Sequence, residues 1–324
     1  MIFFRAIPFS FSILWRYLIA FPVLVIMLVV FGLIAAILAF IASMLSTFVS
    51  VLIIVAFGVG ATAIPVMVGL RVGLQAHYLK PKINYVQMLK PAIGYGLFEA
   101  VVILMILGVA GAVFLFFSSM TPLEMIALGE IDEDALLETL IATDPLLAWG
   151  LIAFVALATF AIRAALLVPL AGASIGVDPS GRPHTPFFGF GSGFLSVFAL
   201  VLLSQLGLSF SVPIAIFGLG ILGIAQDAVM QILLVADGFK GPDDLADLGR
   251  EALILIGTVV FLSLFFFSLQ CAGAVLVFLD KYKEVKNRQK AFDEVMREEE
   301  ERAKPMQDTD LRELLRSRMP ERKY

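Results

Sequence analysis

Charged residues are scarce in this chain, and one long stretch has none at all. Asp, Glu, Lys and Arg together make up 15% of the 324 residues, whereas ordinary soluble domains contain about one quarter. Residues 17–70 contain no Asp, Glu, Lys, Arg or His. One helical membrane crossing needs about 20 apolar residues, so this run is long enough for two. The scarcity of charge excludes an ordinary water-soluble domain and indicates a membrane protein.

Cysteine, histidine and the motifs of catalytic and metal sites are also scarce. The single cysteine, Cys271, lies in an apolar run, where a lone thiol most often behaves as a small hydrophobic side chain. The two histidines, His77 and His184, fall in separate loops, and no HExxH, CxxC or Ser/His/Asp arrangement is present. We therefore predict that the protein is not an enzyme, that it holds no metal or cofactor, and that it binds no nucleic acid.

Apolar residues dominate what is present, and their distribution predicts membrane spans. Hydrophobic residues make up 60% of the chain, and 29 of its residues are Phe. Apolar stretches separated by charged loops predict an all-α membrane protein with about six transmembrane helices in three hairpins. The predicted spans cover about residues 17–41, 48–70, 92–117, 146–170, 194–212 and 252–279.

The loops between these stretches differ sharply in charge, and the difference predicts their orientation. The loop over residues 71–91 carries basic residues and no acid, whereas the loop over 118–145 carries several acids and no Lys or Arg. Basic loops stay on the cytoplasmic side of a membrane. A basic cluster also follows the last apolar stretch, at 281–290. We therefore predict that both termini are cytoplasmic.

The stretch from Phe194 to Ala236 leaves two topologies open. It holds either one crossing followed by a segment at the membrane surface, or two crossings. Because both termini are predicted on the same side, the number of spans is even, which favours six over seven. With six spans, a helix over 214–235 lies at the outer interface and presents Asp227 and Gln231 on one polar face. With seven spans, Asp227 lies within the membrane.

The two ends of the chain are predicted to lie outside the spans. Residues 1–16 combine several aromatic side chains with the charge of Arg5 and predict an interfacial segment. Residues 280–324 mix acids and bases and predict a cytoplasmic helix that extends the sixth span and ends at Pro305. This tail is interpreted either as a solvated segment or as a docking helix for a protein partner.

Two charged residues fall inside predicted spans and are the first candidates for a functional site. A charge in the hydrocarbon region is costly unless it is paired or reaches water. Glu99 on the third span and Arg163 on the fourth both lie ~10 Å from the inner boundary. An ion pair between them would serve helix packing or line a polar cavity. The alternative is that each side chain extends separately to the headgroups.

Three segments are similar to segments of known membrane-protein families. They are Ile83–Phe98, which leads into the third span, Arg163–Gly176, which runs through Pro169 into a Gly-rich loop, and the sequence FLDKYKEVKNRQ after the last span. In these segments the chain resembles the bacterial YciC-like and glycerophosphodiester-phosphodiesterase membrane-domain families. Phe187–Gly193 replaces the Trp and Ser/Thr-Lys/Arg-Gly signature that often follows the fourth span there. The resemblance implies a polytopic architecture and no particular activity.

Together these patterns predict a function through contacts. The leading hypothesis is a non-enzymatic inner-membrane protein with a structural or assembly role, or a role in envelope-lipid homeostasis. It would act through helix packing and its cytoplasmic tail, with the lipid bilayer as one partner and a protein bound through residues 281–324 as another. The alternative is a small-solute or ion transporter that uses the region of Glu99 and Arg163.

Overall fold

The computed structural model describes residues 2–44, 46–117, 145–178, 180–224, 226–230, 232 and 249–317. Among these residues the secondary structure is helical, apart from one isolated antiparallel bridge between Val177 and Pro183. Helix accounts for 87% of the structure. The prediction of an all-α protein is confirmed.

Several helices are long and apolar enough to cross a membrane. The helices are α1 (Ile2–Ser43), α2 (Thr47–Ala76), α3 (Tyr85–Phe117), α6 (Pro145–Ile175), α7 (Phe194–Ser209), α8 (Ser211–Ile221) and α10 (Arg250–Ser317). In the described part of the chain, four helices have the length and composition of a span: α1, α3, α6 and α10. The pair α7 and α8, bent by 59°, makes a fifth if it counts as one span. The apolar helices therefore fit a membrane protein with several spans, as predicted.

α1 and α2 run antiparallel to each other. Near the turn between them, Ser50 Oγ donates to the carbonyl oxygen of Ala39 at 3.0 Å. At their other ends, the rings of Phe9 and His77 lie 4.8 Å apart. The two helices are in contact over much of their length.

α7 packs antiparallel against α10 with almost no space between their backbones. Ser204 Oγ donates to the carbonyl oxygen of Phe266 at 2.6 Å. Gly207 lies directly under the ring of Phe266, and Gly273 of α10 lies under Leu200 of α7. At each of the two glycines a Cβ would collide with the facing side chain, so the close approach of these helices depends on glycine.

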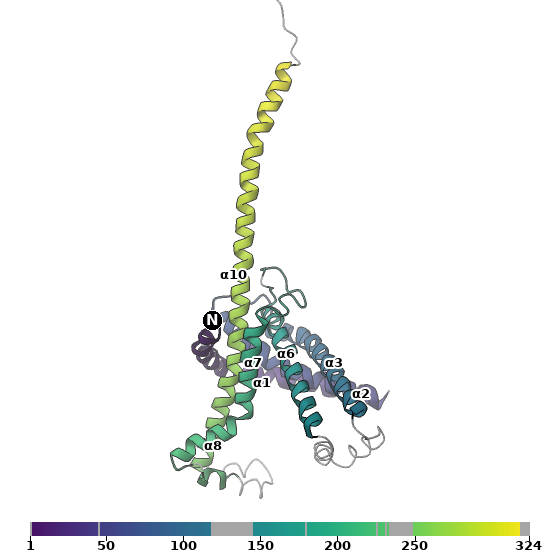
Figure 1. The fold of residues 1–324 in the computed structure, drawn as a ribbon, viewed down its shortest axis with the longest axis vertical. Coiled ribbons are helices and arrows are strands. Elements are labelled where there is room, and N and C mark those ends of the chain that lie inside the picture. The colour runs from purple at the N-terminus through teal and green to yellow at the C-terminus, as the bar shows by residue number, and fades with distance from the viewer. Residues whose placement is uncertain are drawn as a thin grey trace, which may run out of the picture.

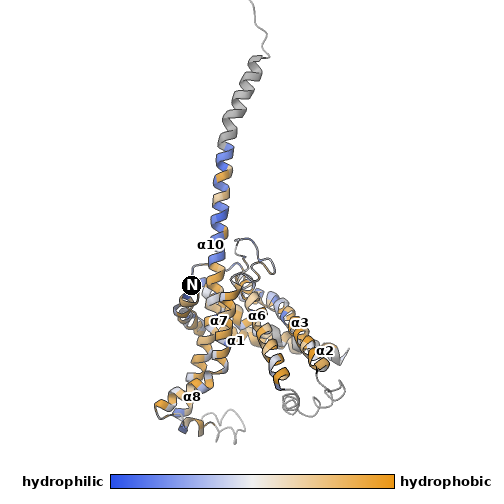
Figure 2. Cartoon of the chain, in the orientation of Figure 1, coloured by the Kyte–Doolittle hydropathy of each residue, from blue (hydrophilic) through white to orange (hydrophobic). Residues whose placement is uncertain are grey.

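α10 is the central helix of the bundle and also its longest. Every residue from Ser268 to Leu279 is buried, and α10 contacts α1, α2, α6, α7 and α8. Beyond Asp280 the helix leaves the bundle and projects away from it alone (Figure 1). The bundle is mostly hydrophobic, whereas the projecting part is mostly hydrophilic as far as residue 300 (Figure 2).

The structure corrects one expected helix end. α10 passes Pro305 and ends at Ser317, so the prediction that Pro305 ends this helix is wrong. A proline removes one backbone hydrogen bond and usually bends a helix. In a helix that projects into solvent, water satisfies the carbonyl that loses its partner, so the helix continues.

The amino-terminal segment forms a single helix with the first apolar stretch. α1 has 42 residues and shows no break at Arg16, so it is ~63 Å long, about twice the ~30 Å of a bilayer's hydrocarbon core. Its burial begins at Ala6, and Ile13 packs against Gly73 of α2. The predicted interfacial segment and the predicted first span are therefore two parts of one packed helix.

Candidate functional site

Glu99 and Arg163 lie on helices that contact each other. Glu99 on α3 is only 8% exposed, and Arg163 on α6 is half-buried. The positive charge of Arg163 acts on Glu99. However, none of the ion pairs between described residues includes Glu99 or Arg163. No carboxylate oxygen of Glu99 therefore lies within 4.0 Å of a guanidinium nitrogen of Arg163. Their role as a polar site in the membrane stays a prediction.

A hydrogen bond between Tyr95 and His184 lies one helical turn from Glu99. Tyr95 precedes Glu99 by four residues, so the two side chains share a face of α3. The hydroxyl of Tyr95 is 3.0 Å from His184 Nε2. Phe187 packs against the rings of Tyr95 and Phe98. The sequence placed these residues in separate segments, whereas the fold gathers them into one polar and aromatic cluster above Glu99.

His184 is held tightly in the loop that follows α6. Its ring rests against Gly172, where a Cβ would lie 3.1 Å from Nδ1. Among the described residues, Nδ1 is buried without a hydrogen-bond partner. Burial lowers the pKa of His184, and the negative charge of Asp178 partly opposes that shift. The imidazole is therefore neutral at neutral pH.

Asp178 shapes the same loop. It is 3% exposed, and both of its carboxylate oxygens accept hydrogen bonds. Oδ1 accepts from the backbone N–H and the hydroxyl of Ser180 and from the backbone N–H of Arg182, while Oδ2 accepts from Thr185 Oγ1 at 3.3 Å. Short polar side chains that bond the following backbone in this way fix a turn. Asp178 therefore has a structural role that sequence reasoning did not identify.

Arg71 is a second buried group whose role the sequence did not show. It is 4% exposed, and Nη1 donates to the carbonyl oxygen of Ser174 and to Met88 Sδ, both at 3.2 Å. Its guanidinium lies 4.2 Å from the centre of the Tyr85 ring, as in a cation–π contact. Arg71 thus joins the ends of α2, α3 and α6. The only sequence signal was its position as the first charge after the uncharged run.

The predicted polar face at Asp227 is described only in part. Asp227 is exposed in a short helical stretch over residues 226–230, beyond α8. Gln231 lies outside the described residues. The prediction of one helix over 214–235 is wrong: α8 ends at Ile221, and a turn at Leu222–Gly223, where glycine has a φ of 73°, separates it from this stretch. Whether Asp227 and Gln231 form a polar face at an interface stays a prediction.

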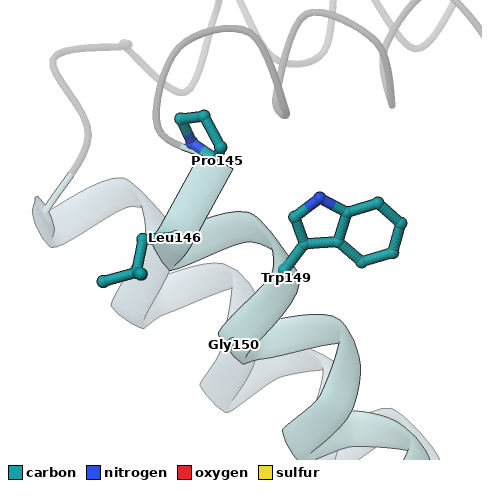
Figure 3. A pocket seen from close by; sticks show the side chains of 4 residues that line it. All are labelled: Pro145, Leu146, Trp149 and Gly150. Carbon is teal, nitrogen blue, oxygen red and sulfur yellow. The ribbon is translucent and has the colours of Figure 1, made fainter.

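Two hollows are lined, as far as the described residues go, by apolar side chains. An open hollow of about 790 Å³ at the start of α6 is lined by Pro145, Leu146, Trp149 and Gly150 (Figure 3). A second, of about 390 Å³, lies between α1 and α2 and is lined entirely by apolar residues such as Phe31. The exposed Trp149 suits the boundary between membrane and water, where Trp is enriched. Both hollows fit contact with lipid.

The described residues include no group of three or more His, Cys, Asp or Glu side chains placed to hold a metal ion. A scan against protein-family models, a search of curated proteins and a search of solved structures each find no match to this chain. The similarity to the YciC-like and glycerophosphodiester-phosphodiesterase membrane-domain families therefore stays a prediction, and the functional argument rests on the geometry.

Proposed function

We propose that this is a six-span inner-membrane protein, not an enzyme, that uses its long terminal helix to hold a cytoplasmic partner protein. Its role would be structural, in envelope assembly or lipid homeostasis. One observation carries the proposal. α10 is a single helix, buried in the centre of the bundle at residues 268–279 and exposed from Lys286 to Glu300 (Figure 1). The bundle serves as the anchor, and the helix extends to the partner.

The lengths of the helices support six crossings. α1, α3, α6 and α10 each suffice for one, and the bent pair α7 and α8 supplies another. α2 has 30 residues, of which only Arg71 is charged. At 1.5 Å per residue it is ~45 Å long, more than the ~30 Å of a hydrocarbon core. Counting α2, six segments are long enough to span the membrane.

Contacts at one end of the bundle support an even number of crossings. Arg5 and Asp280 form an ion pair of 3.6 Å, which brings the start of α1 to the point where α10 leaves the bundle. The backbone N–H of Lys82 donates to the carbonyl oxygen of Ile175 at 2.8 Å, so the start of α3 lies beside the end of α6. Helices that cross the membrane in antiparallel pairs return the chain to the side where it started, which produces this arrangement. The basic residues at this end favour a cytoplasmic position for both termini.

The projecting part of α10 has the properties of a docking helix. Residues 281–317 would span ~55 Å. Phe292, Val295 and Met296 are exposed and share one face of the helix. An amphipathic helix with apolar residues at this spacing commonly binds in a groove of a partner.

Photo-crosslinking in cells tests whether this face binds a partner. A photoreactive amino acid at Phe292 or Met296 should give one discrete adduct. The same amino acid at Lys290 or Glu294, on the opposite face, should give much less. Equal adducts from both faces, or no adduct from either, would contradict the proposal.

Matched substitutions make the test specific. With the photoreactive group at Val295, the double substitution Phe292→Ser and Met296→Ser should abolish the adduct. The control, Lys290→Ser and Glu294→Ser, should retain it. Truncation after Val285 should remove the function and leave the melting temperature of the bundle unchanged, because the side chains from Lys286 to Glu300 are exposed.

A specific observation also supports transport as the alternative function. Glu99 is buried in α3 and lies within the electrostatic reach of Arg163, and charges inside membrane spans often mark ion or proton paths. Vesicles that contain the purified protein and a pH-sensitive dye would report proton flux under an applied potential. If the protein transports protons, Glu99→Gln should abolish the flux. Flux equal to that of protein-free vesicles would remove this alternative for protons.

A further inference from the structure

Two loops far apart in the sequence meet at the end of the bundle where α10 leaves it. We call them the basic loop pair: residues 77–84, between α2 and α3, and residues 176–193, between α6 and α7. Lys82 Nζ donates to the carbonyl oxygen of Gly181 at 3.4 Å. This bond, together with the one from the Lys82 N–H to Ile175, places Lys82 beside the loop that carries Arg182.

The basic loop pair has an excess of positive charge. Residues 71–90 contain Lys, Arg and His but no acid, and Asp178 is the single acid in residues 171–193. Lys80, Lys82 and Arg182 are exposed and form no ion pair with any described residue. The carboxylate of Asp178 is buried and bonded to its own loop, so it is not available to pair with them.

The conformation of both loops is fixed by hydrogen bonds. Val177 and Pro183 form an antiparallel bridge, and the backbone N–H of Gly181 donates to the carbonyl oxygen of Asp178 at 2.9 Å. Gly181 has a φ of 80°, which a glycine adopts without strain. The cations are therefore presented on a preformed surface.

Aromatic side chains are exposed on the same two loops, with Tyr78 two residues from Lys80. Tyr78 is 94% exposed, and Phe187 and Phe190 also face outward. Tyr78 and Phe187 have φ values of 62° and 64°, in the left-handed region that residues with a side chain seldom adopt. Aromatic rings next to Lys and Arg are typical of the boundary between membrane and water.

We propose that the basic loop pair binds the anionic headgroups of phospholipids in the leaflet that it faces. Lys80, Lys82 and Arg182 would contact the lipid phosphates, Tyr78 would lie among the headgroups, and Phe190, which lies deeper along α6, would contact the acyl chains. Basic sites beside the ends of membrane helices commonly recognise anionic lipids in this way. The inference requires that the bundle lie in a membrane and is independent of the partner proposed for α10.

The surroundings favour a lipid over other anions. The loops adjoin the apolar helices α2, α3 and α6 directly, so lipid headgroups are the anions nearest to them in a membrane. A free phosphate would use the cations and leave the exposed rings without a role. A phospholipid would contact both groups.

The test measures lipid binding by the purified full-length protein. Native mass spectrometry would count the phosphatidylglycerol and phosphatidylcholine molecules retained by the wild type and by a variant with Lys80→Gln, Lys82→Gln and Arg182→Gln. We expect the wild type to prefer phosphatidylglycerol. The triple variant should bind it about 100-fold more weakly, since each basic residue near an anionic membrane contributes about fivefold to binding.

A control with the same charge change separates a local site from a general effect. Lys286→Gln, Lys290→Gln and Arg297→Gln neutralise three exposed cations on the projecting part of α10, and this variant should bind phosphatidylglycerol as the wild type does. If the triple loop variant does not fold, the single variants Lys80→Gln and Arg182→Gln should each show about a fivefold loss.

Three outcomes would overturn the proposal. They are equal retention of the two lipids by the wild type, unchanged binding in the loop variants, and equal losses in the control on α10. A competition measurement with inorganic phosphate adds a fourth outcome that would overturn the proposal. If phosphate displaces phosphatidylglycerol at millimolar concentration, the ligand is a free anion. Because the assay contains no partner protein, its failure would leave the proposal for α10 intact.

Discussion

Single glycines determine how closely the helices of this bundle approach one another. Gly207 lies under the ring of Phe266, whereas Gly218 on α8 has no atom within 4 Å of the place where a Cβ would stand. The sequence shows many glycines in apolar helices but cannot distinguish those two situations, because the facing side chain comes from another helix. The difference can therefore be tested by the same substitution at both positions.

We expect Gly207→Ala to destabilise the protein by about 1–3 kcal/mol, since the added methyl group overpacks the contact with Phe266. Gly218→Ala should leave the stability unchanged or raise it by up to about 1 kcal/mol, because alanine is the better helix former. Denaturant titration in detergent micelles would measure both. A larger loss at Gly218 than at Gly207 would contradict this packing of α7 on α10.

The pH dependence of stability should report the burial of His184. Its pKa in the folded protein lies below the ordinary 6.5 because burial disfavours the charged ring. As the pH falls through 6.5, the unfolded chain takes up a proton that the folded protein does not, so the free energy of unfolding decreases. The contribution is fully present well above pH 6.5 and is lost as the pH falls below 6.5 toward the lower pKa of the folded protein. His184→Gln should remove this part of the dependence of the unfolding free energy on pH.

His77 provides the control for that measurement. Burial lowers its pKa as well, with the charges of Lys283 and Arg5 acting in the same direction. His77→Gln should therefore remove only the pH dependence that His77 causes. The free energy of unfolding of this variant should still decrease as the pH falls below 6.5. If the profile of His184→Gln keeps the full slope of the wild type below pH 6.5, His184 is not the buried group that the structure shows.

The residues at the loop end of the bundle were the hardest to predict. Arg71 could be used only as a marker of orientation, because its partners Ser174 and Met88 lie on other helices. Asp178 appeared as an ordinary loop acid. By contrast, Glu99 and Arg163 could be selected from the sequence, since a charge inside an apolar run is visible without any structure.

At the scale of helices, apolar runs predict position well and predict ends poorly. The predicted spans over 48–70 and 146–170 fall inside α2 and α6. The extension of α3 over residues 85–91 was missed, because Gln87, Lys90 and Pro91 interrupt the apolar pattern at its start. The fifth span was predicted to end at residue 212, whereas α7 ends at Ser209 and α8 continues through Pro213 after a bend of 59°.

The continuity of α10 leads to a prediction about distance. Spin labels at Lys283→Cys and Glu300→Cys, in a Cys271→Ala background, should lie ~26 Å apart if the helix is unbroken. Asn287→Pro should broaden the distance distribution, because proline disrupts a helix interior. Asn287→Ala is the control and should leave it narrow. A broad distribution in the unsubstituted helix would show that α10 ends near the bundle.

At the scale of the whole molecule, the number of crossings is the main prediction. We expect single cysteines at Ser119 and Gly241 to be labelled from outside intact cells, and a cysteine at Thr185 to be protected, all in a Cys271→Ala background. Cys271 is the single native cysteine, so in this background each introduced thiol is the only one that the reagent can label. Protection of Gly241 would indicate two crossings over residues 194–235 and would place Asp227 in the membrane.

The arrangement of α10 has a mechanical consequence. The segment at 268–279 is clamped between the other helices, and the rest of the same helix projects by ~55 Å. A stiff rod held at one end acts as a lever, so a small force at its tip produces a torque at its root. Gly193 and Val277, in contact at that root, would receive the torque first. Any load on the far end of α10 is thereby transmitted to the centre of the bundle.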